Sequence, residues 1–284
     1  MAEKNYRAEL VGVFGDPVDG NPTGVVEEAG FAAAGLNYRY ITCKVDVENL
    51  PDAMKGMRAT GMKGVNLTMP HKIAVLEHLD GVTEAARIIG AVNTVYLDGD
   101  KYIGENTDGK GFVRSVKDAG IPLDGKVITI LGAGGAAKAI GVECALAGAR
   151  KINIINRNCA RGEELVKTIS ENTAAEAAFF PWEGTAELPA DTEILINGTC
   201  VGLHPDVDAF PDINYDGIKP GMPVCDVVFN PAMPVFLKKA GEKGANVLTG
   251  LGMLVNQAAL NFEIWTGVKA PRDVMMEALI KEFE

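Results

Sequence analysis

A glycine-rich turn in the segment VITILGAGGAAKAIGVECALAGA (127–149) has the spacing that other chains use to hold a pyrophosphate. A buried strand is predicted over 127–131, and a helix is predicted after the turn. Gly132, Gly134 and Ala137 fit the G-x-G-x-x-G/A pattern, in which glycine leaves room for phosphates that face the helix amides. The same residues could serve tight strand-to-helix packing alone. The predicted cofactor-binding residues of the turn are Gly132, Ala133, Gly134, Gly135 and Ala136.

The next predicted strand, KINIINRN (151–158), bears on which dinucleotide would bind. NAD-binding units of this kind usually carry Asp or Glu near this point for the ribose 2′-hydroxyl, whereas this chain has Asn156 followed by Arg157. Arg157 and Arg161 can pair with a 2′-phosphate through their guanidinium groups. The sequence therefore predicts NADP as the cofactor, unless the arginines only solvate the start of a helix.

A lysine follows an apolar run in VNLTMPHKIAV (65–75). Pro70 should stop strand pairing, so His71 and Lys72 are predicted to begin a helix at the carboxyl edge of a sheet, where open α/β sheets bind ligands. The loops GAVNTV (90–95) and GENTDGKG (104–111) place Asn and Asp amid glycine, and they could converge on the same cleft. An isolated lysine is more often a solvated surface charge.

These loops need elements that position them, and the chain predicts α/β domains. Short Val- and Ile-rich runs alternate with alanine-rich segments, which is typical of βα units around mostly parallel sheets. A chain of 284 residues exceeds the usual size of one core, so two domains are expected. The predicted ranges are a first domain over 1–110, a nucleotide-binding Rossmann domain over 111–245, and C-terminal helices over 246–284 that return to the first domain.

Composition argues against several classes of function. The net charge of −11 disfavours a nucleic-acid partner, because phosphate backbones are held by clustered Lys and Arg. The chain has no apolar run of about 18 residues, and MAEKNYRAEL lacks the apolar stretch of a signal peptide, so no membrane association and a cytoplasmic location are predicted. The five cysteines are scattered and the histidines isolated, so neither a disulfide framework nor a metal site is expected.

Seven successive motifs resemble those of the shikimate dehydrogenase family. They are NLTMPHK, GAVNTV, GENTDGKGF, LGAGGAAKA, NRN with a following arginine, INGTCVGL (196–203) and GLGMLVNQAALNFEIWTG (250–267), in the family's order across nearly the whole chain. The resemblance implies an N-terminal α/β substrate domain and an NADP-binding Rossmann domain with a cleft between them. It also implies reversible hydride transfer between NADP and the C3 oxygen of shikimate or 3-dehydroshikimate. Quinate-using branches of the family prefer NAD or accept either cofactor.

The resemblance assigns roles to single residues at the reacting end. Lys72 and Asp108 match the catalytic lysine and aspartate. Ketone reduction places negative charge on oxygen, which an ammonium can stabilise and protonate while a carboxylate orients it. Thr68, Asn93 and Gln257 match residues that hydrogen-bond the ring hydroxyls of the substrate.

The resemblance also bears on the cofactor and on the histidine beside the lysine. His71 is expected only to make a local hydrogen bond. Met253 matches a position near the nicotinamide, although a plain core role fits it as well. The further cofactor-binding residues that the resemblance implies are Thr199, Val228, Gly250 and Met253.

The chain departs from the family where the substrate carboxylate is held. Family members carry two serines in an S-x-S motif after the first strand and a tyrosine in the motif that aligns with DVVFNP (226–231); here these positions are Asn21, Thr23 and Phe229. Asn21 and Thr23 still offer donors, whereas Phe229 offers none. Losing one hydrogen bond to a charged group costs about 1.5–3 kcal/mol. We call these three positions the clamp.

The sequence therefore predicts an NADP-dependent dehydrogenase that acts weakly on shikimate or acts on a related cyclic polyol or hydroxy acid. One alternative is a shikimate or quinate dehydrogenase with a substituted clamp, in aromatic amino-acid biosynthesis or quinate use. Another is a noncatalytic NADP or metabolite sensor, against which the retained Lys72 and Asp108 count. Family members occur as monomers and dimers, so either state is expected.

Overall fold

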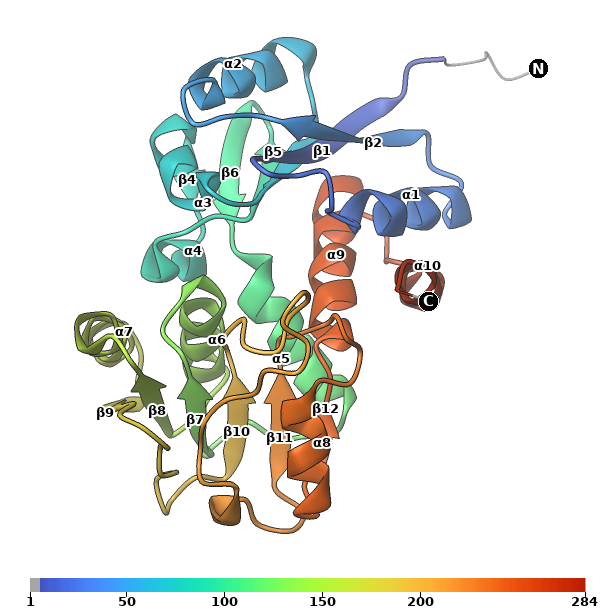
Figure 1. Ribbon diagram of the computed structural model, residues 1–284. Coiled ribbons are helices and arrows are strands. Elements are labelled where there is room, and N and C mark those ends of the chain that lie inside the picture. Colours follow the sequence, from blue (N-terminus) through green and yellow to red (C-terminus); the bar gives the residue numbers. More distant parts are fainter. Residues whose placement is uncertain (1–5, 284) are drawn as a thin grey trace. The chain divides into compact units, whose positions relative to one another are not determined.

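The computed structural model describes residues 6–283. Residues 1–5, part of the stretch inspected for a signal peptide, and residue 284 lie outside the described residues. The chain divides into two compact units, drawn in Figure 1. The first unit contains the chain up to Thr107 together with Gln257–Glu282, and the second contains Asp108–Asn256 and Phe283. The predicted α/β class is confirmed; the predicted domain ranges, and what each part binds, stay predictions.

A six-stranded mixed sheet, in the order β2-β1-β3-β5-β6-β4, forms the centre of the first unit. Its strands are β1 (Glu9–Gly15), β2 (Tyr38–Lys44), β3 (Gly64–Leu67), β4 (Gly81–Val82), β5 (Thr94–Asp98) and β6 (Lys101–Glu105). β1 runs parallel to β2 and β3, whereas β5 is antiparallel to β3 and β6. Only Gly99 and Asp100 separate β5 from β6, which is too short for a parallel crossover, so the two strands form a hairpin.

Helices bury apolar faces against this sheet. They are α1 (Thr23–Ala33), α2 (Leu50–Thr60), α3 (His71–Ala74), the 3₁₀ helix η1 (Val75–His78), α4 (Glu84–Ile89), α10 (Arg272–Lys281) and all but the first turns of α9 (Leu251–Thr266). On α2, Leu50, Met54 and Met57 recur at helical spacing and are buried in the core. Phe31 of α1 stacks on Phe262 of α9 with ring centroids 5.3 Å apart. This packing ties the C-terminal segment to the first strand–helix connection.

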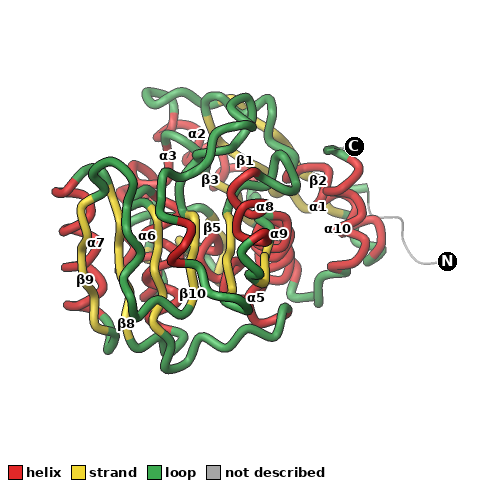
Figure 2. The backbone as a smooth tube through the Cα atoms, turned by 60° about the horizontal axis from the view of Figure 1, so that its bottom comes forward, coloured by secondary structure: helices red, strands yellow, loops and turns green. Residues whose placement is uncertain are grey.

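The second unit is a parallel sheet in the order β9-β8-β7-β10-β11-β12, whose strands Figure 2 shows side by side. Its elements are α5 (Thr107–Asp118), β7 (Val127–Leu131), α6 (Gly135–Leu146), β8 (Lys151–Asn156), α7 (Cys159–Asn172), β9 (Glu176–Pro181), β10 (Ile194–Asn197), η2 (Tyr215–Gly217), β11 (Pro223–Asp226), α8 (Val235–Glu242) and β12 (Asn246–Leu248). Numbered along the chain, the order is 3-2-1-4-5-6, which is the Rossmann arrangement. Every residue of β7 is buried, including Thr129, the one polar residue in an otherwise apolar strand.

Within residues 6–283, helices of the length and apolarity needed to cross a bilayer are absent.

Candidate active site

One edge of the first sheet gathers the polar residues that the sequence singled out. β1 and β3 are parallel, so both end at this edge, and Thr68 directly follows β3. β5 is antiparallel, and its first residue Thr94 pairs with Asn66 of β3 and with Glu105 of β6. Asn93 and Thr107, which flank those strand ends, therefore lie at the same edge as Thr68.

Asn93 is the centre of hydrogen bonding at this edge and is 3% exposed. Its backbone O accepts from Leu67 N at 2.8 Å, and its own N donates to Glu105 O at 3.1 Å. Its side-chain Oδ1 accepts from Thr107 N at 2.7 Å, while Nδ2 donates to Thr107 Oγ1 at 3.0 Å. Thr107 Oγ1 also lies 3.2 Å from Asn93 Oδ1. These contacts fix the residue that precedes Asp108.

Lys72 is the second residue of α3 and is partly buried. The predicted strand end before Pro70 and helix start at His71 are confirmed. Val92 N donates to Lys72 O at 2.8 Å, which ties the lysine backbone to the residue before Asn93. Asp108 is the second residue of α5, partly buried, and belongs to the second unit. The predicted pairing of Lys72 with Asp108 stays a prediction.

His71 and Thr68 have local contacts that explain their positions. His71 is fully buried, with Nε2 2.6 Å from the backbone O of Val45, as expected for a residue with a local hydrogen bond. Thr68 is partly buried, and its side-chain methyl occupies the space where a Cβ of residue 15 would lie. Gly15 at the end of β1 is therefore required for the close approach of Thr68.

The clamp residues Asn21 and Thr23 stand at the start of α1, and they interact with each other. Asn21 Oδ1 accepts from Thr23 N at 2.9 Å. One turn further, Glu27 is 0% exposed, and neither of its carboxyl oxygens has a hydrogen-bond partner among the described residues. Burial raises the pKa of Glu27 well above its ordinary value. Phe229 belongs to the second unit, where its ring centroid lies 5.6 Å from that of Phe283.

The second unit offers a dinucleotide cradle at the carboxyl ends of its strands, where the strand order reverses between β7 and β10. Gly132 has φ +104°, and a Cβ there would lie 2.8 Å from Cγ2 of Thr199. A Cβ at Gly134 or Gly135 would meet open space, and Gly135 begins the twelve-residue helix α6. The turn thus leaves free room at a helix N-terminus, which fits a pyrophosphate between Ala133 and Ala136.

Two buried polar residues hold the neighbouring predicted positions in place. Asn197, the last residue of β10, accepts through Oδ1 from Thr199 N at 3.1 Å and from Thr199 Oγ1 at 2.7 Å. Its Nδ2 donates to Asp226 Oδ1 at 2.9 Å, which also accepts from Val228 N at 2.9 Å. Burial raises the pKa of Asp226 to about 7, although the N–H donors of Val228 and Asn197 act to lower it.

The remaining predicted cofactor residues lie around this cradle within the second unit. A Cβ at Gly250 would lie 2.5 Å from Val228 O, and Met253 is partly buried in the first turn of α9. Asn156 ends β8, followed by the exposed Arg157. Arg161, also exposed, donates its backbone N to the capping Asn158 Oδ1 at 3.0 Å. The first six residues after β8 (157–162) thus include two cations and no carboxylate, which fits a 2′-phosphate.

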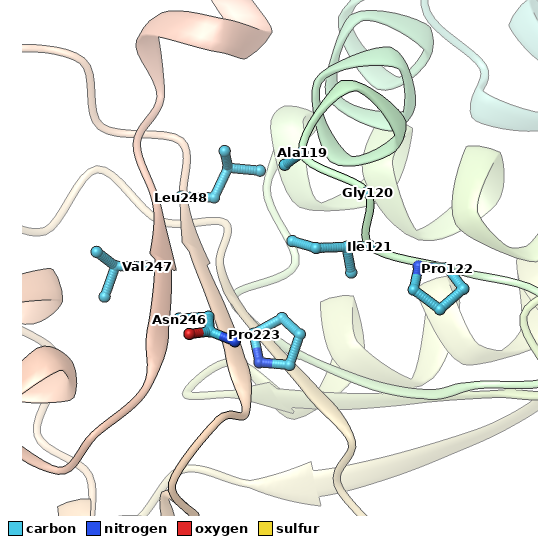
Figure 3. Close-up of a pocket in the computed structure, with 8 residues that line it drawn as sticks. All are labelled: Ala119, Gly120, Ile121, Pro122, Pro223, Asn246, Val247 and Leu248. Carbon is cyan, nitrogen blue, oxygen red and sulfur yellow. The ribbon is translucent and has the colours of Figure 1, made fainter.

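A pocket in the second unit lies apart from all predicted site residues (Figure 3). It is lined by Ala119, Gly120, Ile121, Pro122, Pro223, Asn246, Val247 and Leu248. Pro223 and Asn246 begin β11 and β12, so the pocket opens at the amino ends of these strands. The cradle is at the opposite, carboxyl ends, and we assign the pocket no part in it.

Sequence reasoning missed several buried polar residues of the site. Asn197 and Asp226 lie in quoted motifs but were not recognised as the pair that holds Thr199 and Val228. Asn261, on α9, contacts Gln257 one turn earlier, and its spacing of four residues was the available signal. Thr94 and Thr107 were hidden because their partners come from distant parts of the chain.

The phosphate cradle of the second unit and the polar sheet edge of the first unit are the features of a dinucleotide-dependent oxidoreductase. Two family models match the chain: the shikimate dehydrogenase substrate binding domain at residues 13–95 and the shikimate 5'-dehydrogenase C-terminal domain at 250–280. A shikimate dehydrogenase (NADP(+)) of Desulforamulus reducens is 40% identical over 98% of this chain and 97% of its own length. The chain belongs to the shikimate dehydrogenase family, and its curated relatives are NADP-dependent oxidoreductases.

Two similar solved structures are of enzymes named for different substrates. The ligand-free 5-ketofructose reductase of Gluconobacter sp. strain CHM43 is 45% identical, with a TM-score of 0.94 over 98% of this chain and 100% of that one. A shikimate 5-dehydrogenase from Listeria monocytogenes, in complex with shikimate and NAD, is 34% identical, with a TM-score of 0.91 over 98% and 99% of the two chains. Family membership makes the chain an oxidoreductase and disfavours the sensor alternative.

Proposed function

We propose that this protein is an NADP(H)-dependent reductase of a polyhydroxy ketone that carries no carboxylate, the chemical class to which 5-ketofructose belongs. The ketone, NADPH and one proton give a secondary alcohol and NADP⁺, and the reaction is reversible. The proposal keeps the hydride chemistry of the family and changes the substrate at the end away from the reacting carbon. A cytoplasmic location and a monomeric or homodimeric state stay predictions.

The observation that carries the proposal is the hydrogen bond from Thr23 N to Asn21 Oδ1, at 2.9 Å. Backbone N–H groups at a helix N-terminus are natural partners of a carboxylate, and here the amide of Thr23 is already satisfied by a neighbouring side chain. Asn21 also turns its oxygen toward the helix, so only its amide nitrogen can serve a ligand. The Thr23 backbone amide is therefore not available to a substrate anion, which leaves the Asn21 amide nitrogen and the Thr23 hydroxyl as donors.

Two other features of the clamp support the same substrate class. The helix α1 has no Lys or Arg that could pair with a bound carboxylate, and Glu27, one turn along from Thr23, is buried. Phe229 has no donor to replace the tyrosine hydroxyl of the family pattern. The greater identity with the 5-ketofructose reductase, 45% against 40% for the shikimate dehydrogenase of Desulforamulus reducens, agrees with these departures.

The cofactor role rests on the second unit. The open space at Gly134 and Gly135 would receive the pyrophosphate on the N-terminus of α6, and Arg157 and Arg161 would pair with the 2′-phosphate. When bound, NADPH supplies the hydride. Thr199 and Val228, joined through Asn197 and Asp226, and Gly250, which packs against the backbone of Val228, would line the nicotinamide end.

The reacting end rests on Lys72 and Asp108. As the carbonyl carbon gains a hydride, its oxygen gains negative charge, and the Lys72 ammonium stabilises that charge and gives the oxygen a proton. Asp108 would orient the ammonium. Support comes from the anchoring of both backbones: Val92 N holds Lys72 O at 2.8 Å, and Asn93 holds Thr107, the residue before Asp108. Thr68, Asn93 and Gln257 would bind hydroxyls that do not react.

The clamp variant Asn21→Ser/Thr23→Ser/Phe229→Tyr tests the proposal. Restoring carboxylate donors should lower the KM for 3-dehydroshikimate about tenfold, and it should change kcat little, because such contacts exist in ground and transition states alike. The KM for 5-ketofructose should stay the same or rise. If the parent binds 3-dehydroshikimate tightly and the variant loses affinity, the proposal is wrong.

A second candidate is a shikimate dehydrogenase whose clamp works with Asn21 and Thr23. It is favoured by the curated NADP-dependent shikimate dehydrogenases at 36–40% identity over nearly the whole chain. In that case the Thr23 hydroxyl and the Asn21 amide would hold the carboxylate together. The clamp variant separates the two candidates. If Asn21 and Thr23 already bind the carboxylate, the substitutions should raise the KM for 3-dehydroshikimate; if they do not, the restored donors should lower it.

A further inference from the structure

Asn261 is a fully buried polar residue that lies directly behind a predicted substrate contact. It stands on α9, four residues after Gln257, and is 0% exposed. Its Oδ1 accepts from Thr94 Oγ1 at 2.7 Å and from Thr107 Oγ1 at 2.8 Å. Its Nδ2 donates to Gln257 Oε1 at 3.2 Å. One side chain on α9 thus contacts the first residue of β5, the first residue of α5 and Gln257 of its own helix.

The orientation of the Asn261 amide is fixed by its partners. Each threonine hydroxyl has one proton. Thr107 Oγ1 accepts from Asn93 Nδ2 at 3.0 Å, and Thr94 Oγ1 accepts from Asn66 Nδ2 at 3.0 Å. Both hydroxyls lie 3.2 Å from Asn93 Oδ1, but Asn261 Oδ1 is nearer, at 2.7 Å and 2.8 Å, and is the better acceptor for their protons. With Oδ1 held as the acceptor of two bonds, the other end of the Asn261 amide must be the NH₂ group.

This NH₂ group sets the polarity of Gln257. Asn261 Nδ2 can satisfy only an acceptor, so the carbonyl oxygen of Gln257 faces back toward Asn261. The Nε2 end of Gln257, which is 8% exposed, then remains for a ligand. We infer that Asn261 is a positioning residue that makes Gln257 a hydrogen-bond donor, so that the substrate must present an acceptor oxygen at this place.

The inference rests on the proposed function only in that Gln257 touches the substrate; it holds whether the substrate is 5-ketofructose or 3-dehydroshikimate. A neutral hydroxyl and a carbonyl oxygen both accept from an N–H donor. Without Asn261, the Gln257 side-chain amide could turn either its oxygen or its nitrogen toward the substrate. This would weaken a contact that exists in both the ground state and the transition state, so KM should rise. Thr107 keeps its two bonds to Asn93, so kcat should be retained.

A double-mutant cycle with Gln257→Ala and the nearly isosteric Asn261→Leu tests this, using whichever of the two ketones the parent reduces with NADPH. Each single variant should raise the KM for the ketone about tenfold, with kcat within about threefold of the parent and an unchanged KM for NADPH. Because Asn261 acts through Gln257, the double variant should be no worse than Gln257→Ala. Multiplied effects in the double variant would overturn the inference.

A rise in KM could also come from a general loss of stability, and the variant Asn153→Leu is the control for this. Asn153 is another fully buried asparagine, hydrogen-bonded to Thr129 and Asp191 in the second unit. This variant should lower the melting temperature similarly and leave the KM for the ketone unchanged; an equal rise in KM would refute the positioning role. If Asn261→Leu does not fold, Asn261→Asp takes its place at pH 8–9, where an ionised carboxylate accepts from both threonines but cannot donate to Gln257.

The outcomes separate the inference from the proposed function. If Gln257→Ala alone leaves the KM for the ketone unchanged, the substrate contact at Gln257 is wrong, and the role of Asn261 falls with it. If Gln257→Ala raises that KM and the Asn261 variants do not, the proposed site stands and only the inference fails.

Discussion

At the scale of single residues, the site is predictable where the chemistry is local and hidden where it depends on distant contacts. Lys72 and Asn93 were signalled by polar side chains at the ends of apolar runs, and the structure places Asn93 at the expected sheet edge. Asn261 and Asp226 look like ordinary polar residues in the sequence. Their importance arises from burial and from partners more than 25 residues away, such as Thr94 for Asn261 and Asn197 for Asp226.

Replacing Lys72 with alanine tests the reacting end. The variant should lower kcat by about a hundredfold or more, because general acid catalysis contributes roughly 10²–10⁴-fold and no other ammonium is assigned to the carbonyl. NADPH binding, measured by nicotinamide fluorescence, should be unchanged, since the phosphate cradle belongs to the other unit. Lys55→Ala, an exposed lysine on α2, provides the control. Turnover of Lys72→Ala within about threefold of the parent would rule out the assigned role.

At the scale of elements, the apolar periods predict strands and helices well but do not reveal how their polar faces are used. The strand end at Leu67, the helix from His71 and the helix from Leu251 all follow from sequence patterns. The helix α1 is different: Glu27 is buried on the face that carries Thr23 and Phe31, although a glutamate is expected to face solvent. Only the packed structure reveals this exception.

The buried carboxyl of Glu27 makes stability depend on pH. Its pKa in the folded protein is raised by burial, whereas the unfolded chain has the ordinary value, so the folded state binds the proton more tightly. This contribution is fully present below the unfolded pKa and is lost as pH rises toward the folded pKa. Glu27→Gln cannot ionise, so it should become progressively more stable than the parent from about pH 4 upward.

Thermal unfolding between pH 4 and pH 8 would measure that difference. Glu48→Gln removes the same charge from an exposed position and controls for the change in net charge. A stability gain of Glu27→Gln that shrinks as pH rises would contradict the burial of an unpartnered carboxyl.

At the scale of the whole molecule, the alternation of short apolar runs and alanine-rich segments, together with the glycine-rich turn and the family resemblance, was sufficient to predict the α/β class and the Rossmann unit. It could not predict the antiparallel β5–β6 hairpin, because strand direction depends on a two-residue connection with no periodic signal. The assignment of Gln257–Glu282 to the first unit likewise depends on contacts such as Phe31 with Phe262, which are more than 200 residues apart.

Cofactor choice is a property of the whole protein that thermal unfolding can report. A ligand that binds only the folded state stabilises it by about 2.7 kcal/mol at a concentration of 100 Kd. NADPH should therefore raise the melting temperature more than NADH at equal concentration, because Arg157 and Arg161 can pair with the 2′-phosphate. Arg157→Ala should reduce the NADPH shift and leave the NADH shift unchanged. A larger shift with NADH in the parent would contradict the NADP assignment.

The central claim is that this chain retains the hydride chemistry of its family on a substrate without a carboxylate. Its most direct measurement is the kcat/KM of the purified parent protein for 5-ketofructose and for 3-dehydroshikimate, each with saturating NADPH and followed by the loss of nicotinamide absorbance. The structure, with Thr23 N already bonded to Asn21 Oδ1 and Phe229 in place of a donor, predicts that kcat/KM for 5-ketofructose is at least about tenfold higher, the equivalent of one lost hydrogen bond of roughly 1.4 kcal/mol. A kcat/KM that is higher for 3-dehydroshikimate would contradict the account.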